Sequence, residues 1–289
     1  MQSGQNEYFV PSKMALSVLI LTKDEEHDLP ACLESVRWSD DVHVLDSHST
    51  DATVEVARSR GAMVTQRAFD GYASQRNFGL HSIPYKNAWV LMLDADERVP
   101  EGLRRELATT IENAPLACAA GRLKRRDYWW GKWLKHASIS PFGIRLVRPE
   151  RVRYEREINE QLVVNGEIRD LESHFDHYPF SKGLNHWIHK HNIYSQMEAE
   201  LIASGKFIRG SWSVAMFGRD SNERRLHQKA LFYRMPFRPI IKFVYMLFAR
   251  GAILDGLPGL RYAILQMIYE YFIVLKTKEI QLQKHSNES

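Results

Sequence analysis

The sequence predicts an α/β fold with a mainly parallel central sheet over about residues 15–205, followed by a helical segment over residues 206–289. One observation is that short apolar runs alternate with helix-like segments up to about residue 120, which is typical of βα units. Another is that the apolar run at residues 15–21 is continuous, as in strands that are buried on both faces of a sheet. Residues 1–14 are polar and should form a tail.

The apolar runs place four strands in the first part of the chain. They are expected at residues 15–21, 42–45, 63–65 and 89–93, and the last of these is the most apolar. The run at residues 15–21 is too short for the apolar region of a secretory signal and ends in charged residues. With 289 residues, 44% of them hydrophobic, the chain can build a sizeable core around these strands.

Three helices are expected between and after these strands. Asp28 is a candidate N-cap for the first, with Pro30 in its first turn and Leu29, Leu33 and Val36 on one face. Residues 49–51 form a capping cluster for a second helix over residues 53–60. Residues 66–79 form a polar segment. The third helix follows Pro100 and has apolar residues at Leu103, Leu107 and Ile111.

Three aspartates directly follow predicted strands. Asp46 follows the second strand, and Asp94 and Asp96 follow the fourth. Ligands of open α/β sheets bind at the carboxyl ends of the strands, so acids from separate strands can converge there. Two carboxylates one residue apart suit a divalent cation, because Mg²⁺ or Mn²⁺ binds through one or two carboxylates together with substrate phosphates. An Asp-x-Asp pair is also common as a loop cap, and its position after a buried strand favours the metal site.

Several segments, in order and spacing, resemble the motifs of family 2 glycosyltransferases with the GT-A fold. They are LTKDEE at residues 21–26, DSHSTD at 46–51, QRN at 75–77 and LDADE at 93–97. Within the family, the chain resembles the lipopolysaccharide core β-1,4-glucosyltransferase branch. That likeness continues through residues 128–136, 145–148, 159–162 and 190–195, and so covers roughly residues 15–200.

The resemblance implies a role for each matching residue toward a nucleotide-sugar donor and its metal. Thr22 and Glu25 would hold the nucleoside, Asp46 the base or ribose, and Arg76 would approach the nucleotide; Asp94 would face the ribose and phosphates, and Asp96 would bind Mg²⁺ or Mn²⁺ on the diphosphate. Arg145 is a candidate for the diphosphate oxygens, since a guanidinium fork suits phosphate, with a surface salt bridge as the alternative.

Glu160 is the predicted catalytic base. An inverting displacement needs a base to deprotonate the acceptor hydroxyl, and Glu160 lies well beyond the nucleotide-binding half of the chain. Relatives of this branch often carry His before the Glu, where this sequence has Asn159. The neighbouring acids Glu155, Glu157 and Glu172 are alternatives.

Other polar and aromatic clusters have weaker functional interpretations. Histidines gather over residues 174–191 without the spacing of a zinc site, although His174 could complete the metal shell or touch the diphosphate. The aromatic residues at 128–133 could stack on a sugar or belong to the core. Cys32 and Cys118 show neither disulfide nor metal spacing and are expected to be core thiols in a reducing compartment.

The charge of the chain is uneven. Residues 205–289 hold 14 Lys/Arg and 6 Asp/Glu, a net of +8, whereas the rest of the chain has a net of −4. Such a bias suggests an anionic surface, lipid or nucleic acid, as a partner. The apolar stretches at residues 240–249 and 262–275 are too short to span a bilayer, with a turn expected at residues 255–259 between them. They suit interfacial helices, or alternatively core helices packed on the catalytic domain.

These observations and the resemblance lead to one expected function. The chain would be an inverting hexosyltransferase that uses a nucleotide-sugar, a UDP-sugar in this prediction, and a lipid-linked or lipopolysaccharide core acceptor. It would act at the cytoplasmic face of the inner membrane, on an anionic membrane surface and without nucleic acid. The alternatives are a polyprenyl-phosphate glycosyltransferase and a catalytically idle scaffold of a polysaccharide assembly complex.

Overall fold

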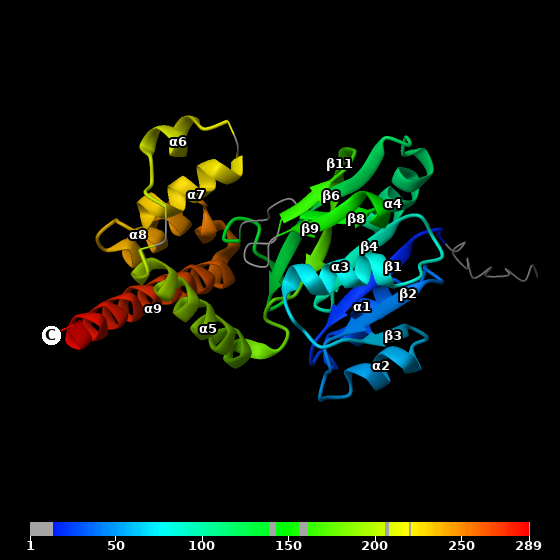
Figure 1. The fold of residues 1–289 in the computed structure, drawn as a ribbon, viewed down its shortest axis with the longest axis horizontal. Coiled ribbons are helices and arrows are strands. Elements are labelled where there is room, and N and C mark those ends of the chain that lie inside the picture. The colour runs from blue at the N-terminus through cyan, green and yellow to red at the C-terminus, as the bar shows by residue number, and fades with distance from the viewer. Residues whose placement is uncertain (1–13, 139–142, 156–160, 206–207, 220, 289) are drawn as a thin grey trace, which may run out of the picture. The chain divides into compact units, whose positions relative to one another are not determined.

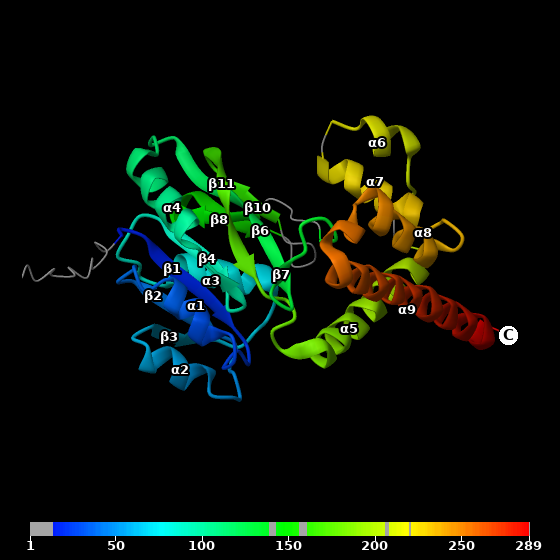
Figure 2. The ribbon, with the colours of Figure 1, turned by 180° about the vertical axis from the view of Figure 1, so that it is seen from behind.

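The computed structural model describes residues 14–138, 143–155, 161–205, 208–219 and 221–288. The chain divides into two compact units, drawn in Figures 1 and 2. The first comprises Met1–Asp127 and Ser140–Ser181, and the second comprises Tyr128–Ile139 and Lys182–Ser289. The predicted boundary near residue 205 follows α5 (Gly183–Ala203), a helix that belongs to the second unit.

A mixed sheet in the order β3-β2-β1-β4-β8-β6-β11-β5 forms the centre of the first unit. The four predicted strands are parallel neighbours, namely β1 (Ser17–Thr22), β2 (Val42–Asp46), β3 (Met63–Gln66) and β4 (Val90–Asp94). The antiparallel strand β8 (Gly143–Val147) then lies between β4 and β6 (Cys118–Trp129). The predicted α/β class with a parallel central part of the sheet is therefore confirmed.

Four further strands lie in this unit. β11 (Glu167–His177) is parallel to β6, and the two-residue β5 (Glu97–Arg98) pairs antiparallel with the end of β11. A short 3₁₀ helix, Pro149–Arg151, leads into β9 (Val152–Glu155), which forms a separate two-stranded sheet with β10 (Gln161–Val164).

Helices cover both faces of the sheet, because successive side chains of the strands point to opposite faces. On one face, Val18 and Ile20 of β1 belong to a core cluster with α1 (Leu29–Ser35), α2 (Thr53–Ser59) and α4 (Glu101–Asn113). On the other face, Leu19 belongs to a cluster with α3 (Tyr72–Ser82) and the β9–β10 sheet.

The structure differs from the predicted helices in two details. The polar segment 66–79 contains most of α3, whose apolar side is weakly marked in the sequence because Gly79 stands on it; a Cβ there would come within 2.7 Å of Leu19 Cδ2, so glycine allows the close approach. Asp28 is the N-cap residue of α1 as predicted, but its side chain makes no capping hydrogen bond and instead accepts one from Ser181 Oγ at 2.6 Å.

A buried polar network ties the beginnings of β1 and β2 together. The Asp41 carboxylate is fully buried and accepts hydrogen bonds from Ser17 Oγ at 2.5 Å and the Lys86 amide at 2.8 Å, with His43 Nε2 at 2.9 Å. Burial would raise the pKa of Asp41, but the hydrogen bonds from these three donors lower it. The carboxylate is therefore ionised in the folded protein.

Asp41→Ala should destabilise the first unit by about 3 kcal/mol at neutral pH, because buried donors lose their acceptor. A lowered folded pKa means that this stability is present above the unfolded pKa of about 3.9 and is lost as pH falls through the folded pKa. Urea unfolding from pH 7 to 3 should show the gap to wild type narrowing below about pH 4. The exposed neighbour Asp40→Ala is the control; an equal loss there would contradict the assignment.

The second unit is helical. α5 packs on the 33-residue α9 (Gly256–Glu288), and α6 (Trp212–Phe217) packs on α7 (Ser221–Phe232). α8 (Arg238–Val244) continues into the π-helix η2 (Tyr245–Ala249) and the 3₁₀ helix η3 (Ala252–Asp255), which leads into α9.

The described residues 128–138 are held to these helices by hydrogen bonds between their backbone and side chains of the helical region. Asp255 Oδ2 accepts from the amides of His136 and Ala137 at 2.9 and 2.7 Å, and Arg250 donates to the Ser138 carbonyl oxygen at 3.1 Å. This segment includes β7 (Lys132–Trp133), which pairs with the end of β6.

The two apolar stretches of this region lie in helices, but the predicted turn between them is wrong. Residues 240–249 fall in α8 and η2, and residues 262–275 lie within α9, which already begins at Gly256. In the part of the chain that the structure describes, every helix is too short or too polar to cross a membrane.

Candidate active site

The ends of β1 and β2 bring two of the predicted nucleoside-binding residues together. Thr22 and Asp46 are partners in the strand register, and Thr22 Oγ1 donates to Asp46 Oδ1 at 3.0 Å. The Ser49 amide and Gln66 Nε2 donate to Asp46 Oδ2 at 2.9 and 3.1 Å. Burial would raise the pKa of Asp46, but these hydrogen bonds lower it, so the buried carboxylate is ionised and positions the loop after β2.

The loop that follows β1 is fastened to the loop that follows β2. Asp24 adopts a left-handed conformation, with φ 53°, and its Oδ1 accepts from the Thr50 amide at 2.7 Å. The Glu25 amide donates to Thr53 Oγ1 at 2.7 Å. The two loops that carry the predicted nucleoside contacts therefore form one continuous edge of the site.

Asp94, Arg76 and Arg145 converge from three different elements. Asp94 ends β4, and its Oδ2 lies 3.1 Å from an Arg145 nitrogen on the neighbouring strand β8. Arg76 on α3 lies 4.0 Å from Asp94 Oδ1. Arg145 also donates to Glu97 Oε1 at 2.7 Å, and Glu97 Oε2 accepts from the Asp94 amide at 2.9 Å. Arg145 is thus part of a largely buried ion-pair network rather than a surface salt bridge.

The charges of this network are coupled. Burial would raise the pKa of Asp94, but Arg145 and Arg76 outweigh it and lower the pKa. Burial raises the pKa of Glu97 to about 7, an effect that Arg145 opposes and Asp94 and Asp96 reinforce. Asp94 therefore keeps its charge, and Arg145 is held by two carboxylates. Contact between Arg145 and a diphosphate stays a prediction.

Asp96 is paired with a histidine that the sequence did not single out. His177 Nε2, at the end of β11, lies 3.3 Å from Asp96 Oδ2, and His177 Nδ1 lies 2.6 Å from Asp127 Oδ1. The buried Asp127 fixes the orientation of the ring. Burial would lower the pKa of His177, but the hydrogen bonds to Asp127 and Asp96 raise it to about 9.

His174, the predicted addition to the metal shell, lies three residues earlier on β11. Side chains alternate along a strand, so His174 and His177 point to opposite faces of the sheet. The structure accordingly brings His177, and not His174, to Asp96. The alternation of side chains along β11 could have shown from the sequence that the two histidines face opposite ways. That His177 meets Asp96 could not be seen there, because it depends on the pairing of β11 with β5 and β6 in the sheet.

Asp96 and His177 suit a divalent cation that also binds a diphosphate. No group of three or more His, Cys, Asp or Glu able to hold a metal is found among the residues that the structure describes. Mg²⁺ at nucleotide sites commonly takes only one or two protein carboxylates, and Mn²⁺ also accepts imidazole. A carboxylate and an imidazole 3.3 Å apart match this donor set once the cation displaces the Nε2 proton that His177 carries in its absence, and phosphate and water oxygens would complete the set.

His177→Ala should raise the Mn²⁺ concentration needed for half-saturation about 10–100-fold in the presence of UDP. The physical reason is that the imidazole and its Asp127 partner define one side of the Asp96 carboxylate. Free Mn²⁺ can be followed by electron paramagnetic resonance, which does not depend on turnover. His174→Ala is the matched control, and equal Mn²⁺ affinity in both variants would remove His177 from the site.

The predicted base, Glu160, lies outside the described residues, as does Glu157. Of the alternative acids, Glu155 ends β9 and pairs with Arg153 at 2.5 Å, while Glu172 is exposed on β11. The base therefore remains a prediction from the sequence.

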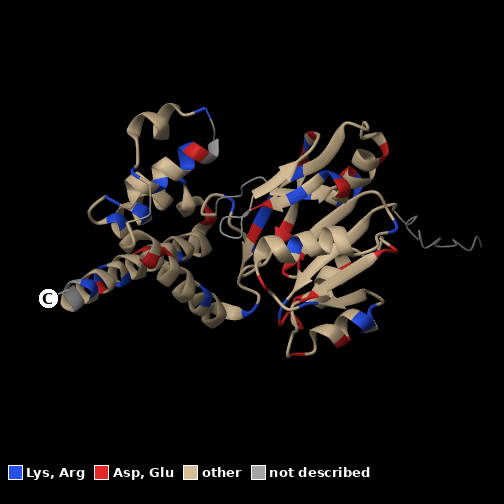
Figure 3. Ribbon diagram, in the orientation of Figure 1, with Lys and Arg blue, Asp and Glu red and all other residues tan. Residues whose placement is uncertain are grey.

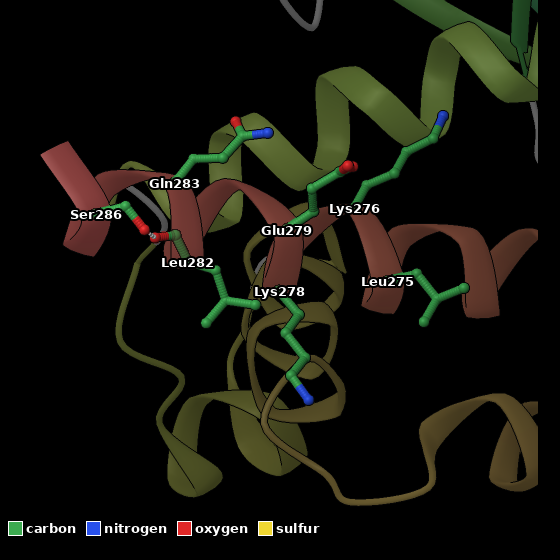
Figure 4. Close-up of a pocket in the computed structure, with 7 residues that line it drawn as sticks. All are labelled: Leu275, Lys276, Lys278, Glu279, Leu282, Gln283 and Ser286. Carbon is green, nitrogen blue, oxygen red and sulfur yellow. Dashed lines mark hydrogen bonds between the residues drawn. The ribbon is translucent and has the colours of Figure 1, made fainter.

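Asp46, Asp94 and Asp96 do not line either of two hollows found in the described chain. A hollow of about 680 Å³ is lined by residues of α9 alone, among them Leu275, Glu279 and Gln283 (Figure 4). A smaller cavity, of about 330 Å³, lies in the first unit beside Asp40 and Gly61, at the opposite ends of the strands from Asp46. The acids therefore lie at the carboxyl ends of the strands and outside both of these hollows.

An α/β fold with acids at the carboxyl ends of its strands is the architecture of a nucleotide-binding enzyme. Residues 17–169 match the family Glycosyl transferase family 2. This match covers more than half of the chain, so the chain belongs to that family, and the predicted GT-A-like fold is confirmed.

Individual relatives agree with this assignment. The chain is 26% identical over 273 residues to the lipopolysaccharide core biosynthesis glycosyltransferase LpsC of Rhizobium meliloti (strain 1021), covering 91% of this chain and 92% of the relative. It is 39% identical over 93 residues to an uncharacterized glycosyltransferase of Rickettsia bellii (strain RML369-C), covering 32% and 31% of the two chains.

Solved structures match less extensively. A crystal structure of glucosyl-3-phosphoglycerate synthase from Mycobacterium tuberculosis, in complex with Mn²⁺, uridine diphosphate and glucosyl-3-phosphoglycerate, is 21% identical. The match covers 40% of this chain and 44% of the other, with a TM-score of 0.32.

Proposed function

We propose that this family 2 glycosyltransferase transfers a hexose, with inversion, from a UDP-sugar to a lipid-linked or lipopolysaccharide core acceptor. The observation that carries the proposal is the convergence of Asp94, Arg76 and Arg145 beside Asp96 at the carboxyl ends of the strands. The similarity to LpsC over nearly the whole of both chains supports a lipopolysaccharide core acceptor.

In the proposed mechanism, the loops after β1 and β2 hold the nucleoside through Thr22, Glu25 and Asp46. Asp94, kept ionised by its two arginines, faces the ribose and phosphates. Asp96 and His177 would hold Mg²⁺ or Mn²⁺, which would supply positive charge to the leaving diphosphate when bound.

The acceptor side of the mechanism depends on a base and on alignment. Glu160 accepts the proton of the acceptor hydroxyl while the hydroxyl oxygen bonds to the anomeric carbon and the bond to the diphosphate breaks. Holding both substrates in line supplies the remaining acceleration.

A panel of nucleotide-sugars, scored by released nucleoside diphosphate with and without Mg²⁺ or Mn²⁺, tests the reaction. We expect metal-dependent release that is largest for one UDP-sugar. Absence of release from every donor in both metals would favour a catalytically idle scaffold. Faster release with polyprenyl phosphate than with lipopolysaccharide core would favour a polyprenyl-phosphate glycosyltransferase.

The basic second unit is proposed to place the enzyme on an anionic membrane surface, at the cytoplasmic face of the inner membrane. Lys and Arg recur along α7, α8 and α9, as Figure 3 shows. Basic side chains near an anionic leaflet contribute about 1 kcal/mol each, and salt screens this attraction.

The full chain should therefore bind vesicles with anionic lipid more tightly than neutral vesicles, with partial release at high salt and full release by detergent. The exposed pair Arg225→Glu and Lys278→Glu should weaken binding about tenfold or more, since two attractions become repulsions. Vesicle sedimentation measures this. Arg58→Glu on α2 with Arg60→Glu at the C-cap of that helix, both exposed in the first unit, is the matched control, and equal weakening would refute the location.

A further inference from the structure

The helix formed by α8 and η2 carries an exposed apolar face. Phe237 at its start, Ile240, Val244 and Phe248 recur at helical spacing and are 77, 57, 48 and 72% exposed. Ile241 and Tyr245 widen the same face, and both are also exposed. A helix in a water-soluble unit normally turns such a stripe toward the core.

The opposite face of this helix carries the charges. Arg238, Lys242 and Met246 recur at intervals of four residues, and Arg238 and Met246 are buried. Arg238 Nε lies 3.7 Å from Glu270 Oε2 on α9, and its guanidinium stacks on Tyr233 at 4.9 Å. Burial raises the pKa of Glu270, an effect that Lys242 and Arg238 oppose. The charged residues of the helix therefore lie on its inner face together with the apolar Met246, and its outer face is hydrocarbon.

The apolar surface extends on both sides of the helix. Ile253 and Leu254 of η3, which packs on η2, and Leu257 at the start of α9 are 60, 70 and 62% exposed. On the other side, a groove of about 700 Å³ runs between α8 and α9, with Phe237, Ile240, Tyr271 and Val274 among its walls. Lys278 also lines this groove, so a cation stands beside its apolar lining.

We propose that this apolar face, from Phe237 to Phe248 with Ile253, Leu254 and Leu257, inserts into the hydrocarbon of an anionic membrane leaflet. The inference rests on the membrane partner of the proposed function. It adds which residues contact the membrane and that they reach the hydrocarbon layer. The twelve residues of α8 and η2 are far fewer than the roughly 20 of a spanning helix, so the helix lies in the plane of the interface.

Charge decides between a leaflet and a protein as the occupant. The exposed Arg234 precedes the inserted stretch, within a region of net charge +8, which matches an anionic headgroup layer around a hydrocarbon layer. A second copy of the chain would bring the same positive charge to the contact. The ion pair of Arg238 and Glu270 allows the helix to keep its polar groups within the unit while its outer face meets lipid.

Depth can be measured with a single attached probe, because the two native cysteines are both buried. Val244→Cys, labelled with an environment-sensitive fluorophore, should shift to the blue on vesicles of anionic phospholipid and be quenched by brominated acyl chains. Glu112→Cys, exposed on α4 of the first unit, is the control and should keep its aqueous spectrum.

The necessity of the face can be tested by Ile240→Glu with Phe248→Glu. Both side chains are exposed, so the fold should survive, which circular dichroism checks. Vesicle binding should fall about tenfold or more, and the binding that resists high salt should be lost. Asn185→Glu with Gln283→Glu adds the same charge at exposed polar positions and should leave the salt-resistant part intact.

The outcomes separate this inference from the membrane proposal itself. If the wild-type chain ignores anionic vesicles, the membrane partner fails. If it binds but the probe at Val244 stays aqueous and high salt releases all protein, the partner stands and insertion is refuted. If light scattering shows a lipid-free dimer that Ile240→Glu with Phe248→Glu converts to a monomer, and the probe ignores lipid, the face is an interface between copies.

Discussion

Replacing Asp96 with alanine should abolish turnover, with a loss on the order of 10³-fold or more in kcat. The physical reason is that Asp96 would be the carboxylate ligand of the cation that offsets the charge of the leaving diphosphate. Metal-dependent binding of UDP should disappear with it. Turnover assays in Mg²⁺ and Mn²⁺, together with calorimetric titration of UDP with and without metal, measure both effects.

Asp170→Ala provides the matched control for this substitution. Asp170 is an exposed aspartate on β11 that pairs with Arg122 at 2.7 Å, so its loss removes one carboxylate from the same unit. The control should keep nearly full activity. Near-normal activity of Asp96→Ala in either metal would show that the cation is held elsewhere.

The position of the acids could be predicted from the sequence because it depends on local rules. A continuous apolar run followed by Asp94 and Asp96 predicts a buried strand and a ligand at its end, and the structure places Asp94 at the last residue of β4. Thr22 and Asp46 came together for the same reason, since parallel neighbouring strands end at one edge of the sheet.

The partners of those acids could not be predicted, because they depend on the order of strands in the sheet. Arg145 meets Asp94 only because β8 enters beside β4 and antiparallel to it. His177 meets Asp96 because β5 pairs with the end of β11, 80 residues later in the chain. Neither pairing leaves a periodic pattern in the sequence.

The periodicity of the sequence also could not predict which side of the helix over residues 238–249 faces the core. The apolar stretch at residues 240–249 predicts a helix with an apolar side, but it does not say whether that side faces the core. Contacts of Arg238 with Tyr233 and Glu270, which lie in other parts of the unit, decide that the charged side is buried. The apolar side is left exposed as a consequence.

Glu160→Gln should lower kcat by about 10²–10⁴-fold while leaving the affinity for the donor nearly unchanged. A glutamine keeps the size and polarity of the side chain but cannot accept the proton of the acceptor hydroxyl. The nucleotide would be held by residues of the first strands, so its binding should not sense the change. Single-turnover rates at saturating acceptor, combined with donor titration, separate the two quantities.

Glu155→Gln and Glu172→Gln remove a charge at two of the three competing acids and test the assignment of the base against them. Glu155 is already paired with Arg153, and Glu172 is exposed on β11, so both variants should keep most of their activity. The pH profile of kcat adds an independent criterion. The base must be ionised to accept a proton, so the fall in kcat at acidic pH that reports its protonation should disappear in Glu160→Gln alone. Weakened donor binding with intact turnover at saturation would instead assign Glu160 to the nucleotide site. A larger loss in either control variant would identify that acid as the base.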